Sequence, residues 1–275
     1  MADLGRPIVP REHGAWAVLY GSLLVGLGVA GRVSVPVLLF LVGMTACAFA
    51  NGPLALLVRP PGGPGQVARR RQAVLWILIY GAVAVATLLP LVTVFRMTFL
   101  VPFGMGAVFF VVVRAYQLRE REDRSLAGAL TGMAGITLAA PAAHAVAVGG
   151  AQPVGAMLWG LCILFFGSGI FYVRMRVQGM LAVRQGAPAR ANPARLPCIL
   201  YHALLLVAIP LLAVWEVVPW TVLVAFAPAV WRAGVGLRRD EARLELRRLG
   251  WSEVALTSSF ILLLIGALRL APILG

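Results

Sequence analysis

The chain has 275 residues, of which 61% are hydrophobic and 12% charged, and its mean hydropathy is +0.91. Apolar stretches recur at lengths near the roughly 20 residues that cross a bilayer, which excludes an ordinary soluble protein and indicates a multi-pass membrane protein. The net charge of +14 comes entirely from Arg residues that are predicted to line one membrane face, so we expect no nucleic-acid partner.

Hydropathy predicts nine membrane-spanning helices, so the expected fold is an all-α helical bundle that forms a single membrane domain over residues 1–275. The predicted spans are 14–32, 34–58, 73–95, 97–115, 125–149, 154–173, 197–218, 220–233 and 253–274. Glycines at positions 21 and 26 in the first span, and 128, 132 and 135 in the fifth, are expected to allow close helix packing.

The distribution of arginine predicts the orientation of these spans. All but three of the 24 basic residues fall in the N-terminal segment and in the loops after the second, fourth, sixth and eighth spans. Only Arg32, Arg96 and Arg269 fall on the other side. The positive-inside rule therefore places the N-terminus in the cytoplasm, and we expect the inner (cytoplasmic) membrane of a bacterium.

The first candidate site is the stretch "PREHGAW" at 10–16, which places three ionisable groups just before the first span. Glu12 suits the positive end of a helix dipole, and Arg11 can extend to lipid phosphates. His13 could carry a proton or bond a ligand. We therefore name Glu12 and His13 as candidate catalytic residues and Arg11 as a candidate ligand-binding residue; a purely structural role remains the alternative.

A second candidate site follows the sixth span, in "GSGIFYVRMRVQ" at 167–178. On a continuing helix Tyr172 and Arg176 share one face, and Arg174 lies on another. A guanidinium group has a planar fork of donors that suits phosphate or carboxylate, so these residues could hold an acidic head group. The alternative is that both arginines are interface anchors.

Four further residues complete the predicted ligand-binding set. Asn51 stands two residues before Pro53 in the second span, where a broken helix could line a cavity, and Arg59 ends that span. Tyr201 and His202 in the seventh span could face the same cavity. A simple helix kink is the alternative at Asn51 and Pro53, and a packing role is the alternative for His202.

These stretches together resemble the YwiC-like family of bacterial membrane proteins. The matching residues are "PREHGAW" at 10–16, "RAYQLREREDRSLAGALTGMAG" at 114–135, "GSGIFYVRMRVQ" at 167–178, "YHALLL" at 201–206 and "LGWSEVALTSSFILLL" at 249–264. The resemblance implies a membrane bundle, and the family offers no defined activity to carry over to this chain.

Nine spans with a cytoplasmic N-terminus also resemble, more distantly, the UbiA superfamily of intramembrane prenyltransferases. That superfamily carries Asp-rich motifs at the ends of spans two and six. Here Asn51 is retained, but the three Asp positions of the first motif read Gly52, Ala55 and Arg59, and the second motif reads as the arginines already named. Magnesium needs oxygen ligands, and these positions offer no carboxylates. Magnesium-diphosphate chemistry is therefore disfavoured, and we expect no metal at this site. A haem role for the three histidines is also not expected.

The sequence leaves three hypotheses open. The leading one is a cytoplasm-facing intramembrane cavity that binds or modifies an amphiphilic isoprenoid, quinone or lipid with a polar or anionic head. Whether the protein is an enzyme is open; if so, it would be a UbiA-like transferase without the metal motifs. The alternatives are a small-solute transporter and a membrane assembly factor without chemistry, and no protein partner is identified.

Overall fold

The structure is a computed structural model that describes residues 7–8, 13–59, 66–122, 125–186, 192–238 and 245–270; the side chains of residues 13 and 66–68 are outside this description. The chain divides into two compact units, residues 1–156 and 157–275, and the boundary falls in the first turn of a helix. Whether the two units form one membrane domain, as the sequence predicts, is not tested by this division.

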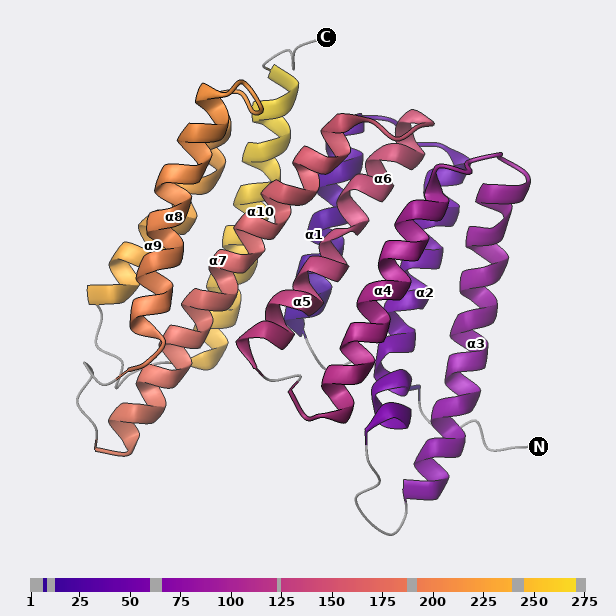
Figure 1. Ribbon diagram of the computed structural model, residues 1–275, viewed down its shortest axis with the longest axis horizontal. Helices are drawn as coiled ribbons and strands as arrows, with labels where there is room; N and C mark the ends of the chain where they lie inside the picture. Colours follow the sequence, from indigo (N-terminus) through magenta and orange to yellow (C-terminus); the bar gives the residue numbers. More distant parts are fainter. Residues whose placement is uncertain are drawn as a thin grey trace. The chain divides into compact units, whose positions relative to one another are not determined.

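The described part of the first unit contains six helices, which run roughly side by side except that α5 and α6 follow each other end to end (Figure 1). They are α1 (His13–Ala30), α2 (Val35–Val58), α3 (Gln66–Thr93), α4 (Leu100–Arg119), α5 (Leu126–Thr137) and α6 (Ala139–Val148). Helix α2 packs on α3, and α1 packs on α5 and α6. The core between α1, α2 and α6 is apolar and includes Leu23, Phe40 and Ala143.

The residues described in the second unit form four helices. They are α7 (Pro153–Arg184), whose first turn belongs to the first unit, α8 (Arg195–Val214), α9 (Val222–Arg238) and α10 (Leu246–Leu270). Helix α9 packs on both α8 and α10. Phe165 of α7, Phe226 of α9 and Phe260 of α10 pack their rings together and join three of these helices in the core.

The described chain is entirely helical, without a strand, and it is a polytopic membrane bundle as predicted. Seven helical segments are long and apolar enough to cross a membrane. Helices α1 and α9, with 18 and 17 residues, are at the short end of the range that spans a bilayer. The last predicted span, 253–274, begins too late: α10 starts at Leu246, so Glu253 lies seven residues beyond the start of the helix and not at its first residue.

The fifth predicted span is interrupted at Leu138, which separates α5 from α6. The cause is Pro141, which has no backbone N–H to donate to the carbonyl of Thr137 four residues earlier. The backbone N–H groups of Leu138 and Ala142 make only long bonds of 3.3 Å at the interruption. The two helices together still form one segment of membrane-crossing length, Leu126–Val148.

Helix α2 continues through Pro53 to Val58, so the break considered for this span does not occur. Its C-terminal carbonyl groups are satisfied from α3, because Nη2 of Arg70 donates to the carbonyl oxygens of Leu57 at 3.1 Å and Arg59 at 3.0 Å. The last carbonyl groups of any helix lack partners within the helix. Arg70 therefore caps α2.

Close packing at small residues is confirmed at two of the predicted glycines. A methyl group on Gly26 of α1 would lie 2.2 Å from the backbone oxygen of Ala140 in α6, and one on Gly135 would lie 2.7 Å from Cβ of Phe110. The prediction was wrong for Gly132, where a methyl group would meet nothing within 4 Å. Helix α1 thus contacts the backbone of α6 directly.

We predict that Gly26→Ala lowers the free energy of unfolding by about 1–3 kcal/mol, because a backbone carbonyl cannot rotate away from the added methyl group. The measurement is unfolding of the purified protein in mixed micelles. The matched control is Gly81→Ala in α3, where the methyl group meets nothing within 4 Å; it should leave stability unchanged or raise it slightly, because Ala favours a helix. Equal stability of Gly26→Ala and the wild type would contradict the α1–α6 contact.

Candidate functional site

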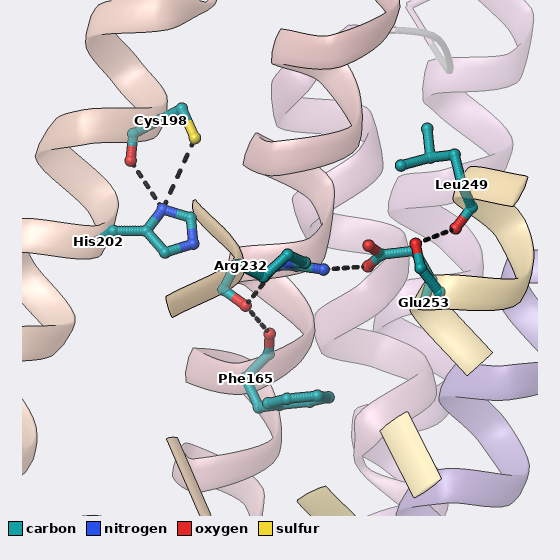
Figure 2. Close-up of polar contacts among 8 residues, drawn as sticks. Phe165, Cys198, His202, Arg232, Leu249 and Glu253 are labelled. Atoms are coloured by element: carbon teal, nitrogen blue, oxygen red, sulfur yellow. Dashed lines mark hydrogen bonds and ion pairs between the residues drawn. The ribbon is translucent and has the colours of Figure 1, made fainter. Parts of the chain in front are cut away.

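An ion pair joins Arg232 of α9 to Glu253 of α10. The two side chains are 11% and 24% exposed, so neither is sealed from its surroundings. Figure 2 shows the guanidinium group of Arg232 pointing directly at the carboxylate of Glu253. Ionisable groups inside apolar helices are costly and usually functional. The pair is therefore the starting point for a site.

Helix α7 supplies two more contacts to Arg232. The guanidinium carbon lies 4.2 Å from the centre of the Tyr172 ring, a cation–π contact. Nη2 of Arg232 lies 3.5 Å from the hydroxyl oxygen of Ser168, at the limit of a hydrogen bond, and that hydroxyl donates to the carbonyl of Phe165 at 2.7 Å. We refer to Ser168, Tyr172, Arg232 and Glu253 as the Arg232 cluster.

Arg176 holds α7 against the end of α9. Its Nη1 donates to the carbonyl of Gly236 at 2.9 Å, and the side chain is buried. Gly236 also makes room for Tyr172, because a methyl group there would lie 2.4 Å from the ring. Arg195 of α8 donates in the same way to the carbonyl of Leu237 at 3.2 Å. Both arginines therefore cap the last carbonyl groups of α9.

Helix α8 is joined to α7 by Tyr201. Its hydroxyl donates to the carbonyl of Leu164 at 3.1 Å, and its ring stacks on Phe171 with centroids 4.4 Å apart. Gly167 admits the hydroxyl, which would be 2.2 Å from an added methyl group. One residue further, buried His202 places Nδ1 2.8 Å from the carbonyl oxygen of Cys198.

Several polar atoms of this region keep unused hydrogen-bonding capacity. Within the described part of the chain, Nε of Arg232, Oε1 of Glu253, Nε of Arg176 and Nε2 of His202 are buried and have no hydrogen-bond partner. Buried polar groups are normally paired, so each of these atoms is suited to bond a polar group that binds in this region. The region can thus both donate and accept additional hydrogen bonds.

The chemistry available to the Arg232 cluster is binding and orientation. A guanidinium group stays charged and donates only, whereas a carboxylate accepts only, so the pair can hold a polar head group at two points. Among the residues that the structure describes, no three His, Cys, Asp or Glu side chains come together as a metal site.

Comparison with known proteins gives one finding. Residues 9–144 match the model of the YwiC-like protein family. This part of the chain is YwiC-like. No curated protein and no solved structure matches the chain.

The YwiC-like segment contains α1 to α5 and most of α6, all in the first unit, and it ends before α7. The predicted resemblance to the YwiC-like family is confirmed for the stretches at 10–16 and 114–135, which both lie within the matched residues. The Arg232 cluster belongs to the second unit, beyond the match. The likeness of the later stretches, and the distant resemblance to the UbiA superfamily, stay predictions.

The YwiC-like segment holds five of the predicted site residues. Arg11 and Glu12 lie outside the described residues, as does the side chain of His13, although His13 begins α1. Asn51 is exposed on α2, and Arg59 is the exposed C-cap of that helix. The structure therefore leaves the roles of all five as predictions.

The other five predicted residues lie in the second unit. Tyr172 and Arg176 are buried and contact α9, Arg174 is half-buried on α7, and Tyr201 and His202 lie on α8. Because the units are not placed relative to each other, the expected meeting of Glu12 and His13 with Tyr172 and Arg176 stays a prediction. What the structure does show is that Tyr172 belongs to the Arg232 cluster.

Sequence reasoning missed Ser168, Arg232 and Glu253. The predicted spans 220–233 and 253–274 place Arg232 and Glu253 at helix ends, and the charge distribution groups Arg232 with the loop after span eight. The structure places both residues well inside helices. The order of the spans was a signal for this pair, because two consecutive spans are antiparallel and the end of one lies beside the start of the next. In the structure Arg232 precedes the end of α9 by six residues and Glu253 follows the start of α10 by seven, so the two residues lie at a similar depth.

We predict that Arg232→Gln and Glu253→Gln each lower the free energy of unfolding by about 1–3 kcal/mol, because each leaves a charge without its partner in an apolar setting. The double variant Arg232→Gln/Glu253→Gln should lose less than the two single losses added together, by at least about 0.5 kcal/mol. Unfolding in mixed micelles gives all four values. Strict additivity would show that the ion pair contributes nothing to the folded state.

Proposed function

We propose that this integral membrane protein binds an amphiphile, an isoprenoid, quinone or lipid with a polar or anionic head, at the Arg232 cluster, and modifies it or presents it to a partner. The observation that carries the proposal is the Arg232–Glu253 pair: two opposite charges within membrane-length helices, partly exposed, each with one buried polar atom unpaired. We further propose the inner (cytoplasmic) membrane of a bacterium as its location.

The position of the cluster supports this proposal. Arg232 is near the end of α9 and Glu253 near the start of α10, the side that the arginine distribution predicts to be cytoplasmic. A head group held there would leave its tail among the exposed apolar side chains of the same helices, which include Val224 of α9 and Val254 and Leu262 of α10. An amphiphile matches this combination of a polar point and an apolar surface.

The contacts also redistribute the predicted roles. Arg176 already donates to the carbonyl of Gly236 and is buried, which favours a capping role over gripping a ligand. Arg232 has both the exposure and the remaining donor that a ligand requires. The test of ligand binding is therefore best made at Arg232.

We predict that Arg232→Gln purified from membranes retains several-fold less of one amphiphile per protein than the wild type does, as measured by mass spectrometry of extracted lipids. The removed guanidinium group takes away the donors that hold the head. The matched control is Arg269→Gln, an exposed arginine at the far end of α10, which should retain the wild-type amount.

A charge-swapped variant, Arg232→Glu/Glu253→Arg, guards against simple loss of folding. It keeps opposite charges in contact while moving the donor from α9 to α10, so it should fold and still lose the amphiphile. Unchanged amphiphile content in folded Arg232→Gln and in the swapped variant would overturn the proposal.

One observation favours a second candidate function, transport of a small solute. The interruption of the fifth span at Leu138 resembles the discontinuous helices that line transporter sites, and buried His144 lies just beyond it in α6 with Nδ1 unpaired. The head-group proposal predicts no protein-dependent solute uptake into sealed vesicles. Uptake that is lost in His144→Phe but kept in the exposed α4 variant Tyr116→Phe would favour the transporter instead.

A further inference from the structure

His202 is held in a single orientation on α8. Nδ1 lies 2.8 Å from the carbonyl oxygen of Cys198, one turn earlier, and 3.6 Å from the sulfur of the same residue. A carbonyl oxygen can only accept, so Nδ1 carries the proton. In the neutral ring Nε2 is then a hydrogen-bond acceptor.

This acceptor is buried and unused. The His202 side chain is 5% exposed, and Nε2 has no hydrogen-bond partner within the described residues. Helices α8 and α9 pack together, and Figure 2 shows Nε2 of His202 on the side of the ring that faces Arg232. An acceptor and a charged donor group therefore stand on neighbouring helices.

Arg232 brings an unused donor to the same region. Its Nη1 is taken by Glu253 and its Nη2 lies near Ser168, but its Nε is buried and has no partner in the described chain. Because the positive charge of Arg232 is already balanced by Glu253, a second anion would be repelled by that carboxylate. The charges favour a neutral head.

A hydroxyl group meets all of these conditions, because it donates one hydrogen bond and accepts others. We propose that the head group bound by this protein carries a hydroxyl, an alcohol or a phenol, which donates to Nε2 of His202 and accepts from Nε of Arg232. The inference rests on the proposed function and names its substrate class. An ether or a fully ionised phosphate has no proton to give His202, so either would leave a buried acceptor unpaired.

The test uses two probes that differ only in that proton, 4-heptylphenol and its methyl ether 4-heptylanisole. Binding of each to the delipidated protein in nanodiscs is measured by calorimetry. We predict that the phenol binds at least about tenfold more tightly than the ether, as expected when a buried acceptor loses its partner. In His202→Phe, which keeps a ring but no acceptor, the ratio should fall to near one, whereas His202→Gln, which keeps an acceptor, should retain part of it.

The outcomes separate the two proposals. Equal binding of phenol and ether to the wild type would overturn the hydroxyl inference and leave the proposed function standing, because an amphiphile still binds. Binding of neither probe to the wild type would count against the proposed function itself. A preference for the phenol that persists in folded His202→Phe would show that another residue accepts the proton, which overturns the role of His202.

Discussion

A charge that enters a bilayer has to find its partner inside the protein, and the second unit meets this constraint at the contact between Arg232 and Glu253. The other helices are arranged around it. Helix α7 places the Tyr172 ring over the guanidinium group, and Gly236 of α9 is the small residue that lets that ring approach. A larger residue at that position would push α7 away from α9 and leave the ion pair open on one side. The contact of the Tyr172 ring with Arg232 therefore requires a small residue at position 236.

The bilayer imposes a second constraint, because lipid cannot donate hydrogen bonds to the last carbonyl groups of a helix. In both units arginine side chains donate these bonds. Arg70 donates to the end of α2, and Arg176 and Arg195 donate to the end of α9. The helices that end on the predicted cytoplasmic side end there with their negative dipole, so arginine is favoured by topology and by capping at once. An arginine at such a position is weak support for ligand binding on its own.

This double role explains where sequence reasoning succeeded and where it stopped. Hydropathy located the spans, because apolar length needs no knowledge of neighbours, and the i,i+4 spacing correctly put Tyr172 and Arg176 on one face of a helix. The structure shows that this face is directed toward α9. It could not tell that Arg176 is occupied by a carbonyl group, because that partner is 60 residues away in the chain. Arg232 was hidden for a related reason: counting charges by loop treats every arginine at the end of an apolar run as solvated. Only the pairing of α9 with α10 shows that Glu253 lies at the same depth.

The balance of charge in the second unit changes which ligand is sensible. An arginine-lined site without carboxylates would favour an anionic head, which is what the stretch at 167–178 indicates when it is read alone. With Glu253 against Arg232 the charge of this pair is close to zero, and the unpaired atoms of the pair and of His202 are one guanidinium nitrogen, one carboxylate oxygen and one imidazole nitrogen. A donor and acceptors together match a group that can both donate and accept. A phosphate would accept from the guanidinium group, but it would leave both acceptors buried without a proton. It would also bring a second negative charge close to Glu253. The site is therefore expected to bind a phosphate weakly although Arg232 attracts it.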